Sequence, residues 1–266
     1  VIIAAAAATT VFALRDSGHE QDDIPDSPAL VGAGYTPVLE PRECPATSTA
    51  AGIDVRCLDL VVPEDRDDTS GRQVRIMVLV APSPARDPGD PTLVLGVGFN
   101  SRSLNQSDVR GYGDTVIFGR RGDEFSSPEL TCPELSAAGR EFFALPQNSP
   151  EYNQVFVNAA AECGRRLAGD GVDLDAYGLN DIVLDVRDLA LAMGWQHINI
   201  EAHWDVSRVP ALLAARYPGL LRSVVLVDAK PPNEGSGVDV GAYNGAVEAY
   251  VAACRADEAC ERTFPD

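Results

Sequence analysis

Three side chains that can take part in nucleophilic or acid–base chemistry stand close together in one stretch of the chain: His203, Asp205 and Ser207. A serine hydrolase holds its nucleophile within about 2.6–3.2 Å of a base, and a third group orients that base. Residues this close together on a turn point in different directions, so we do not expect a catalytic set. We expect His203 to be a hydrogen-bonded residue at a strand end and Ser207 to start or cap the next helix.

The residues around this group predict a strand, a sharp turn and a helix. Ile198 and Ile200 are the β-branched residues of a short apolar strand, and residues 208–216 have the spacing of an apolar helix. An α/β-hydrolase places its nucleophile in such a turn, within the motif G-x-S-x-G. Here the residue at the apex is Trp204, whose indole has no nucleophilic oxygen or sulfur. The stretch therefore predicts a hydrolase scaffold that has lost its chemistry.

Other functional motifs are missing from the sequence. No G-x-S-x-G occurs anywhere in the chain. Neither a P-loop nor a G-x-G-x-x-G is present, so nucleotide binding has no support. The absence of C-x-x-C and the presence of only three histidines (His19, His197 and His203) argue against a zinc site. We therefore predict no metal and no cofactor. The net charge of −19 argues against nucleic acid or an anionic membrane as partner. Asp228 stands at the end of the next strand. It could act as an acid, but we interpret it as a turn or cap residue.

The order of the predicted elements indicates the fold class. We predict strands over residues 55–62, 73–80, 92–96, 115–118 and 223–228, and helices over residues 150–167, 180–193 and 240–253. The first two strands alternate as a half-exposed antiparallel pair does. The second helix has one apolar stripe (Ile182, Val186, Leu189 and Met193), and we expect Asn180 to cap it. This order predicts an α/β protein with a mostly parallel sheet and antiparallel lead-in strands.

The N-terminal part differs in composition from the rest. Residues 1–14 are uncharged and apolar, but a bilayer span needs roughly 20 residues. We interpret residues 1–15 as the tail of a membrane anchor or a signal remnant, with a buried helix as the alternative. Residues 16–50, rich in proline and polar residues, are predicted to be a linker, and residues 51–266 an α/β-hydrolase-like domain. Six cysteines without metal spacing favour disulfides, and nearest-neighbour pairing is one of many connectivities.

Several segments, taken in order, resemble the secreted tripeptidyl-aminopeptidase (proline-iminopeptidase-like) branch of α/β-hydrolases. The resemblance runs from about residue 44 to residue 266. It rests on cysteines before a strand that ends in V-P-x-D, on a glycine-containing loop, on an arginine–glycine segment, and on a closing pair of cysteines. In this chain these are Cys44 and Cys57 with Leu60–Asp65, Leu93–Gly98, Gly119–Ser126 with Cys132, Cys163–Ala168, Arg216–Asp228, and Cys254 with Cys260. The resemblance implies the pairs Cys44/Cys57, Cys132/Cys163 and Cys254/Cys260.

The chain departs from this family where catalysis should occur. Trp204 stands at the position of the nucleophilic serine, and both flanking glycines are replaced. Gly96 and Gly98 are what remains of the loop that supplies an oxyanion-hole N–H in the family. The sequence stops at Asp266, at the start of what would be the lid, so the family's acid and base have no counterpart.

These departures favour a catalytically inactive homologue that acts as an extracytoplasmic binding or structural subunit, secreted or membrane-anchored through residues 1–14. We expect Trp204 to plug the vacated pocket, with contact to a partner as the alternative. An open sheet exposes its edge, so we expect a protein partner or a missing C-terminal segment to cover it. Two alternatives stay open: an active serine peptidase or esterase with a relocated or second-chain catalytic set, and a small-molecule carrier.

Overall fold

The computed structural model describes residues 34–49, 54–85, 89–100, 103, 113–142, 145–146, 149–229 and 240–264. It divides into two units, residues 1–229 and 230–266, which are described separately. The segment predicted as an anchor or signal remnant, residues 1–15, lies outside the described residues, as does His19. Among the residues that are described, no helix combines the length and the apolar character needed to cross a membrane.

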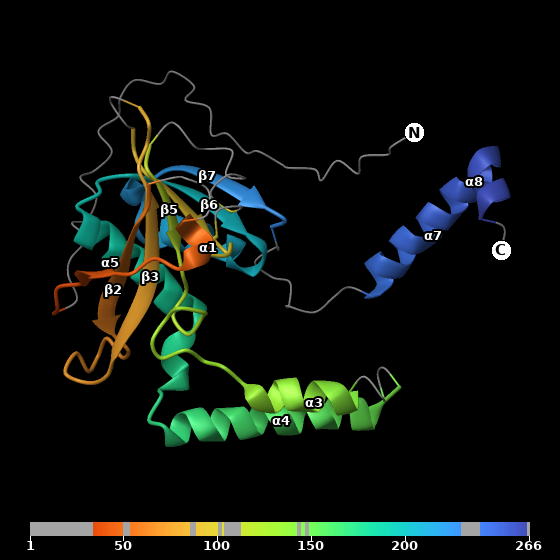
Figure 1. Cartoon of the computed structure of the whole chain (residues 1–266), viewed down its shortest axis with the longest axis horizontal. Coiled ribbons are helices and arrows are strands. Elements are labelled where there is room, and N and C mark those ends of the chain that lie inside the picture. Colours follow the sequence, from red (N-terminus) through yellow and green to blue (C-terminus); the bar gives the residue numbers. More distant parts are fainter. Residues whose placement is uncertain are drawn as a thin grey trace. The chain divides into compact units, whose positions relative to one another are not determined.

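The first unit is built on a seven-stranded sheet with the order β1-β2-β3-β5-β4-β6-β7 (Figure 1). Its strands are β1 (Val38–Arg42), β2 (Arg56–Pro63), β3 (Gln73–Ala81), β4 (Thr92–Leu95), β5 (Thr115–Phe118), β6 (Ile198–His203) and β7 (Leu221–Val227). The pairs β1–β2, β2–β3 and β3–β5 are antiparallel, and the pairs β5–β4, β4–β6 and β6–β7 are parallel. The predicted fold class, a mostly parallel α/β-hydrolase-like sheet with antiparallel lead-in strands, is confirmed.

The predicted linker over residues 16–50 is wrong for its last part. Val38–Arg42 forms the edge strand β1 in register with β2, and α1 (Ala46–Thr49) follows it. Arg42 Nη1 donates a hydrogen bond to Asp59 Oδ1 at 2.8 Å, and Leu39 packs against the core. The strand contains Pro41, which an edge strand tolerates because one side of its backbone needs no ladder hydrogen bond.

Helices join the strands. They are α3 (Pro133–Phe142), α4 (Pro150–Gly169), α5 (Leu179–Met193) and α6 (Val209–Arg216), with short 3₁₀ turns at Leu174–Tyr177, Trp204–Arg208 and Pro218–Leu220. Helices α5 and α6 pack on the sheet, whereas α3 and α4 pack against each other (Figure 1). Helix α4 begins where Ser149 Oγ accepts a hydrogen bond from the N–H of Tyr152 at 3.1 Å. The predicted cap of α5 by Asn180 is wrong. The N-cap is Gly178, and Asn180 Oδ1 instead accepts a hydrogen bond from Arg216 Nη2 at 2.8 Å.

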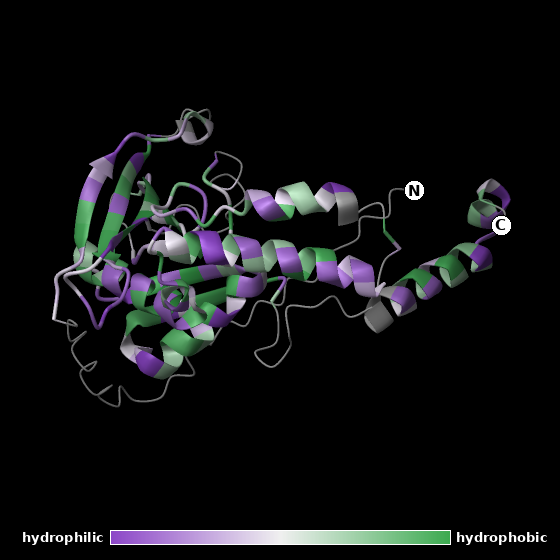
Figure 2. Cartoon of the chain, turned by 90° about the horizontal axis from the view of Figure 1, so that it is seen from below, coloured by the Kyte–Doolittle hydropathy of each residue, from purple (hydrophilic) through white to green (hydrophobic). Residues whose placement is uncertain are grey.

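The core lies on both faces of the sheet. On one face the predicted stripe of α5 packs on the strands, with Val186 and Leu189 fully buried. Ile200 of β6 and Leu213 of α6 belong to the same cluster. A smaller cluster, which includes Met77 and its neighbours on β3, β4 and β5, fills part of the opposite face. Figure 2 shows hydrophobic residues recurring along the strands and along the helices.

Disulfides tie the chain locally in both units. The structure contains the pairs Cys44–Cys57 and Cys132–Cys163 in the first unit and Cys254–Cys260 in the second, as the resemblance implies. The second unit consists of α7 (Val240–Ala256) and α8 (Glu258–Thr263), with Asp257 as the N-cap of α8. Three disulfides indicate an oxidising, extracytoplasmic compartment.

Candidate functional site

The predicted elbow lies at the carboxyl end of β6, where the chain turns from the strand into α6. Trp204 takes φ = 56°, a left-handed conformation that is uncommon for a residue with a Cβ. The 3₁₀ turn Trp204–Arg208 follows, and then α6 begins with Pro210 in its first turn. The backbone therefore makes the sharp strand–turn–helix at which α/β-hydrolases expose a nucleophile, although the glycines of that motif are absent.

Trp204 does not plug a pocket, so that prediction is wrong. Its side chain is exposed, with 56% of the residue's surface open to solvent. The physical reason is the turn itself, because Ala202 and Val206 on either side of it take the buried positions. Those two residues stand where the motif has its glycines, and both belong to the main hydrophobic cluster. Trp204 is left at the apex, pointing its large apolar surface into solvent.

Gly96, on the loop after β4, approaches the elbow closely. Its φ is +79°, and a Cβ built on it would lie 2.8 Å from the carbonyl oxygen of His203. The requirement for glycine is weaker at Gly98, because a Cβ there would meet only the side-chain nitrogen of Asn100 at 2.8 Å. The loop predicted to be the remnant of an oxyanion loop thus still lies beside the elbow.

Asp205 is held by an arginine from the loop after β5. Arg120 Nη1 donates to Asp205 Oδ2 at 2.8 Å, and Arg120 Nε donates to Asp123 Oδ2 at 2.7 Å. Burial works to lower the pKa of Arg120, but the hydrogen bond and charge of Asp123 and the charge of Asp205 outweigh it and raise the pKa. Asp205 therefore faces a permanent cation.

His203 is engaged within its own strand. Its Nε2 lies 2.7 Å from Glu201 Oε1, two residues earlier on the same face of β6. The ring N–H on that side donates to the carboxylate, as expected for a hydrogen-bonded residue at a strand end. Ser207 is 4% exposed and lies within the 3₁₀ turn. The prediction that it starts or caps α6 is wrong, because the N-cap of α6 is Arg208 and no side chain caps it.

These partners decide what the elbow can do chemically. The apex has no oxygen or sulfur nucleophile, Asp205 faces Arg120, and His203 faces Glu201. A base–nucleophile pair needs direct contact, and its nucleophile must also reach the substrate. Ser207 is buried, so it is poorly placed to reach a substrate. Asp228, after β7, adopts φ = 50° in a bend, in agreement with the prediction of a turn residue.

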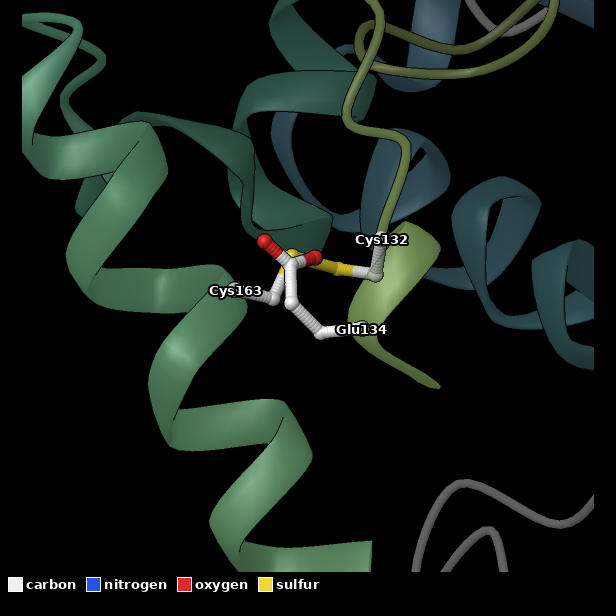
Figure 3. A group of neighbouring side chains, drawn as sticks. All are labelled: Cys132, Glu134 and Cys163. Carbon is white, nitrogen blue, oxygen red and sulfur yellow. A yellow bond between two sulfur atoms is a disulfide. The ribbon is translucent and has the colours of Figure 1, made fainter. Parts of the chain in front are cut away.

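One group of side chains has the composition of a metal site: Cys132, Glu134 and Cys163 (Figure 3). The two sulfurs are bonded to each other as a disulfide, so neither is available as a thiolate ligand. The carboxylate of Glu134 accepts hydrogen bonds from Arg166 Nε at 2.6 Å and from Nη2 at 3.2 Å. Hydrogen bonding to Arg166 lowers the pKa of Glu134. The donor set does not fit a cation.

A buried ion-pair network, which the sequence pattern did not predict, joins α5 to arginines that follow β2 and β5. Arg121 is fully buried and donates to both carboxylate oxygens of Asp185, at 2.7 and 2.8 Å. It also donates to the carbonyl oxygens of Glu64 and Ala176, at 3.0 and 2.6 Å. Every one of these partners is an acceptor, so the guanidinium is neutralised and satisfied.

Arg66 extends this network to a second carboxylate. Its Nη2 donates to Asp185 at 2.5 Å and to Asp188 at 3.0 Å, and its Nε donates to the hydroxyl of Tyr35 at 3.0 Å. Burial works to lower the pKa of Arg66, but the charges of Asp185 and Asp188 outweigh it and raise the pKa. Charged groups on the otherwise apolar helix α5 were the available signal in the sequence. Because the charges are paired and buried, we read the network as structural.

Among known proteins, this chain is similar to solved structures only, and not to any family model or curated sequence. Among solved structures, the epoxide hydrolase of Aspergillus niger is 13% identical, and the alignment covers 74% of this chain and 41% of that one with a TM-score of 0.37. Epoxide hydrolase A from Mycobacterium thermoresistibile is 16% identical, with coverage of 65% and 42% and a TM-score of 0.35.

The haloalkane dehalogenase DatA from Agrobacterium tumefaciens is 13% identical, with coverage of 64% of this chain and 40% of that one and a TM-score of 0.34. The chain thus spans less than half the length of each of these three structures. The fold class stands on the strand order and the elbow described above.

Proposed function

We propose that this chain is a catalytically inactive relative of the secreted tripeptidyl-aminopeptidase-like hydrolases, and that it acts as an extracytoplasmic binding or structural subunit. The observation that carries the proposal is Trp204, a tryptophan exposed at the apex where the fold presents its nucleophile. Large aromatic side chains on a rigid support are common anchors of protein interfaces. We therefore propose that the elbow, with Trp204 at its centre, is the surface that meets a protein partner.

Two contacts support the loss of catalysis. The Arg120–Asp205 ion pair lies directly beside the apex and engages the nearest carboxylate with a permanent cation, so this carboxylate does not orient a base. The Glu201–His203 contact holds the nearest imidazole along its own strand. For the alternative of an active peptidase or esterase with a relocated set, Ser207 is the serine nearest the apex in sequence, and this residue is buried.

The small-molecule carrier has less support. A cavity of about 360 Å³ in the second unit is lined by side chains of α7 and α8, including Tyr250 and Val251, and by Phe264 directly after α8. No elbow residue lines it.

The test is labelling with a fluorophosphonate probe, which reacts covalently with activated serines. We expect no specific labelling of the natural chain above a heat-denatured control. A Trp204→Ser variant should also stay unlabelled, because restoring an oxygen at the apex does not restore a base. Folding of the variant is checked by circular dichroism.

Specific labelling of the natural chain would overturn the proposal and assign the active serine by mass spectrometry. Labelling of the Trp204→Ser variant alone would show that a working base and oxyanion site remain. In that case only the nucleophile has been lost, and the proposal of a wholly inactive site would be wrong.

A further inference from the structure

The loops that follow the parallel strands lie along one edge of the sheet. Neighbouring strands in the run β5, β4, β6 and β7 are parallel, so their carboxyl ends share this edge. Open α/β sheets bind ligands outside the carboxyl ends of such strands. The exposed Trp204 comes directly after β6. A partner that binds at the usual edge of this fold therefore meets the indole.

The indole of Trp204 offers both its ring face and its N–H. Among the residues that the structure describes, no cation or aromatic ring stacks on it, and its Nε1 donates no hydrogen bond. The left-handed backbone, with a buried residue on either side of the turn, presents the ring to solvent. The face of an aromatic ring is negative, and among the aromatic residues tryptophan attracts a cation most strongly.

The carboxylate next to the ring is engaged through one oxygen only. Asp205 accepts from Arg120 through Oδ2, and in the described part of the chain its Oδ1 has no hydrogen-bond donor. Asp123 likewise accepts from Arg120 through Oδ2. One guanidinium thus serves two carboxylates, and the group keeps a net negative charge. The side chains of Asp205 and Asp123 are 52% and 43% exposed, so a second cation can reach them from solvent.

Acidic residues outnumber basic ones on the described loops after β5, β6 and β7. The acidic residues, all at least partly exposed, are Asp123, Glu124, Glu129, Asp205 and Asp228. The partly exposed basic residues are Arg120 and Arg208, while Arg121 is buried against Asp185. The net charge of the whole chain is −19. The local charge and the overall charge therefore both favour a cationic partner.

We propose that the protein partner of the elbow presents an arginine, which stacks on the indole of Trp204 and donates to Asp205 Oδ1. Arginine fits both groups, because its planar guanidinium stacks on aromatic faces and donates to carboxylates from a rigid fork of N–H groups. Tryptophan and arginine are also enriched among the residues that dominate binding at protein interfaces. The inference rests on the proposed function, since it gives the chemistry of the partner that meets Trp204.

The test uses a tetra-arginine peptide, acetylated and amidated at its ends, in place of the partner. Fluorescence polarisation of the labelled peptide measures its affinity for the full chain at about 0.15 M salt, where charge attraction beyond about 8 Å is screened. We expect a dissociation constant below about 1 mM. A tetra-citrulline peptide has nearly the same shape without the charges, and it should bind at least about tenfold more weakly.

Heteronuclear NMR of the two indole N–H groups shows where the peptide binds. Trp204 follows β6 and Trp195 precedes it, so the two indoles come from opposite ends of this strand. We expect a saturable shift of the Trp204 signal and none of the Trp195 signal. The spectrum of a Trp204→Leu variant assigns the two signals.

Substitutions at the elbow separate the two contacts. Trp204→Leu keeps an apolar side chain without a π face and should weaken peptide binding about fivefold, whereas Trp204→Tyr keeps an aromatic face and should stay within about twofold of the natural chain. Asp205→Asn should weaken binding about threefold. Asp170→Asn is the matched control, because it removes the same charge from the exposed C-cap of α4 and should leave the affinity unchanged. Melting temperatures confirm that each variant is folded.

Two results would overturn the inference. One is a natural chain whose Trp204 signal shows no saturable shift. The other is equal weakening by Asp205→Asn and Asp170→Asn, because binding would then follow the net charge and not the elbow. The fluorophosphonate experiment separates this inference from the proposed function. Labelling of the natural chain overturns the inactive subunit whatever the peptide does, whereas an unlabelled chain that fails to bind the peptide overturns the arginine partner alone.

Discussion

Gly96 and Val206 lie so close that a Cβ on the glycine would come within 2.7 Å of Val206 Cγ2. Val206 is 1% exposed and part of the main cluster, so it has little room to move. The loop after β4 can therefore approach the elbow after β6 this closely only because Gly96 has no side chain. The fit holds although the elbow has lost its own glycines.

Gly96→Ala should destabilise the fold. The added methyl group meets Val206 and the His203 carbonyl, and the left-handed φ of +79° penalises any Cβ. We expect a loss of about 2 to 4 kcal/mol in the free energy of unfolding, measured by urea denaturation. Gly139→Ala is the control, since no atom lies within 4 Å of its added Cβ on α3. That substitution should stabilise by about 0.5–1 kcal/mol. Equal effects for both variants would contradict the close fit.

Two adjacent arginines should differ widely in their effect on stability. Arg121→Ala leaves Asp185 buried with one cation fewer, and we expect a loss of about 3–5 kcal/mol. Arg120→Ala removes partly exposed ion pairs with Asp123 and Asp205, and we expect a loss below about 1 kcal/mol. Chemical denaturation of both variants measures the difference. A small effect of Arg121→Ala would show that the network contributes little.

Much of the fold was predictable because its signals are local. The alternating strands, the apolar stripe of α5 and the turn after β6 each follow from periodicity within one segment. Strand β1 was not predicted because Val38–Arg42 contains a proline and follows a proline-rich stretch. Such a segment becomes a strand only when β2 offers an edge to pair with. This pairing depends on the tertiary structure and not on the local sequence.

The candidate site was predictable in position and less so in detail. Sequence order placed Trp204 at the apex, but a large aromatic residue is usually buried, and its exposure follows from the left-handed φ. The ion-pair network was beyond reach, because Tyr35, Arg66, Arg121 and Asp185 come from four separate segments. Only the folded chain shows which charges meet.

Tyr35 should make stability depend on alkaline pH. Burial, and then the hydrogen bond to Asp188, raise the pKa of Tyr35 from 10.0 to about 12 in the folded chain. A raised pKa stabilises the fold at pH values below the unfolded pKa, and this contribution is lost as pH rises from about 10 to about 12. The natural chain should therefore lose its advantage over Tyr35→Phe across this range. Urea denaturation of both proteins at pH 9, 10 and 11 measures it, and a constant difference would contradict the assignment.

The left-handed backbone at Trp204 can be isolated by comparing two substitutions at the same position. Trp204→Gly and Trp204→Ala both remove the indole, which is 56% exposed, so the loss of its contacts is nearly common to the two. The two variants differ in the Cβ of alanine, which at φ = 56° destabilises the folded state by about 1–2 kcal/mol. Glycine has greater conformational freedom in the unfolded chain, and this destabilises the glycine variant by about 0.4–1 kcal/mol. We therefore expect the glycine variant to be the more stable by about 1 kcal/mol in urea denaturation. At Ala202, in the regular strand before the apex, substitution by glycine should lower stability instead. If alanine at position 204 proved as stable as glycine, the elbow would have relaxed from its left-handed turn, and Trp204 would not be held at the apex by the backbone.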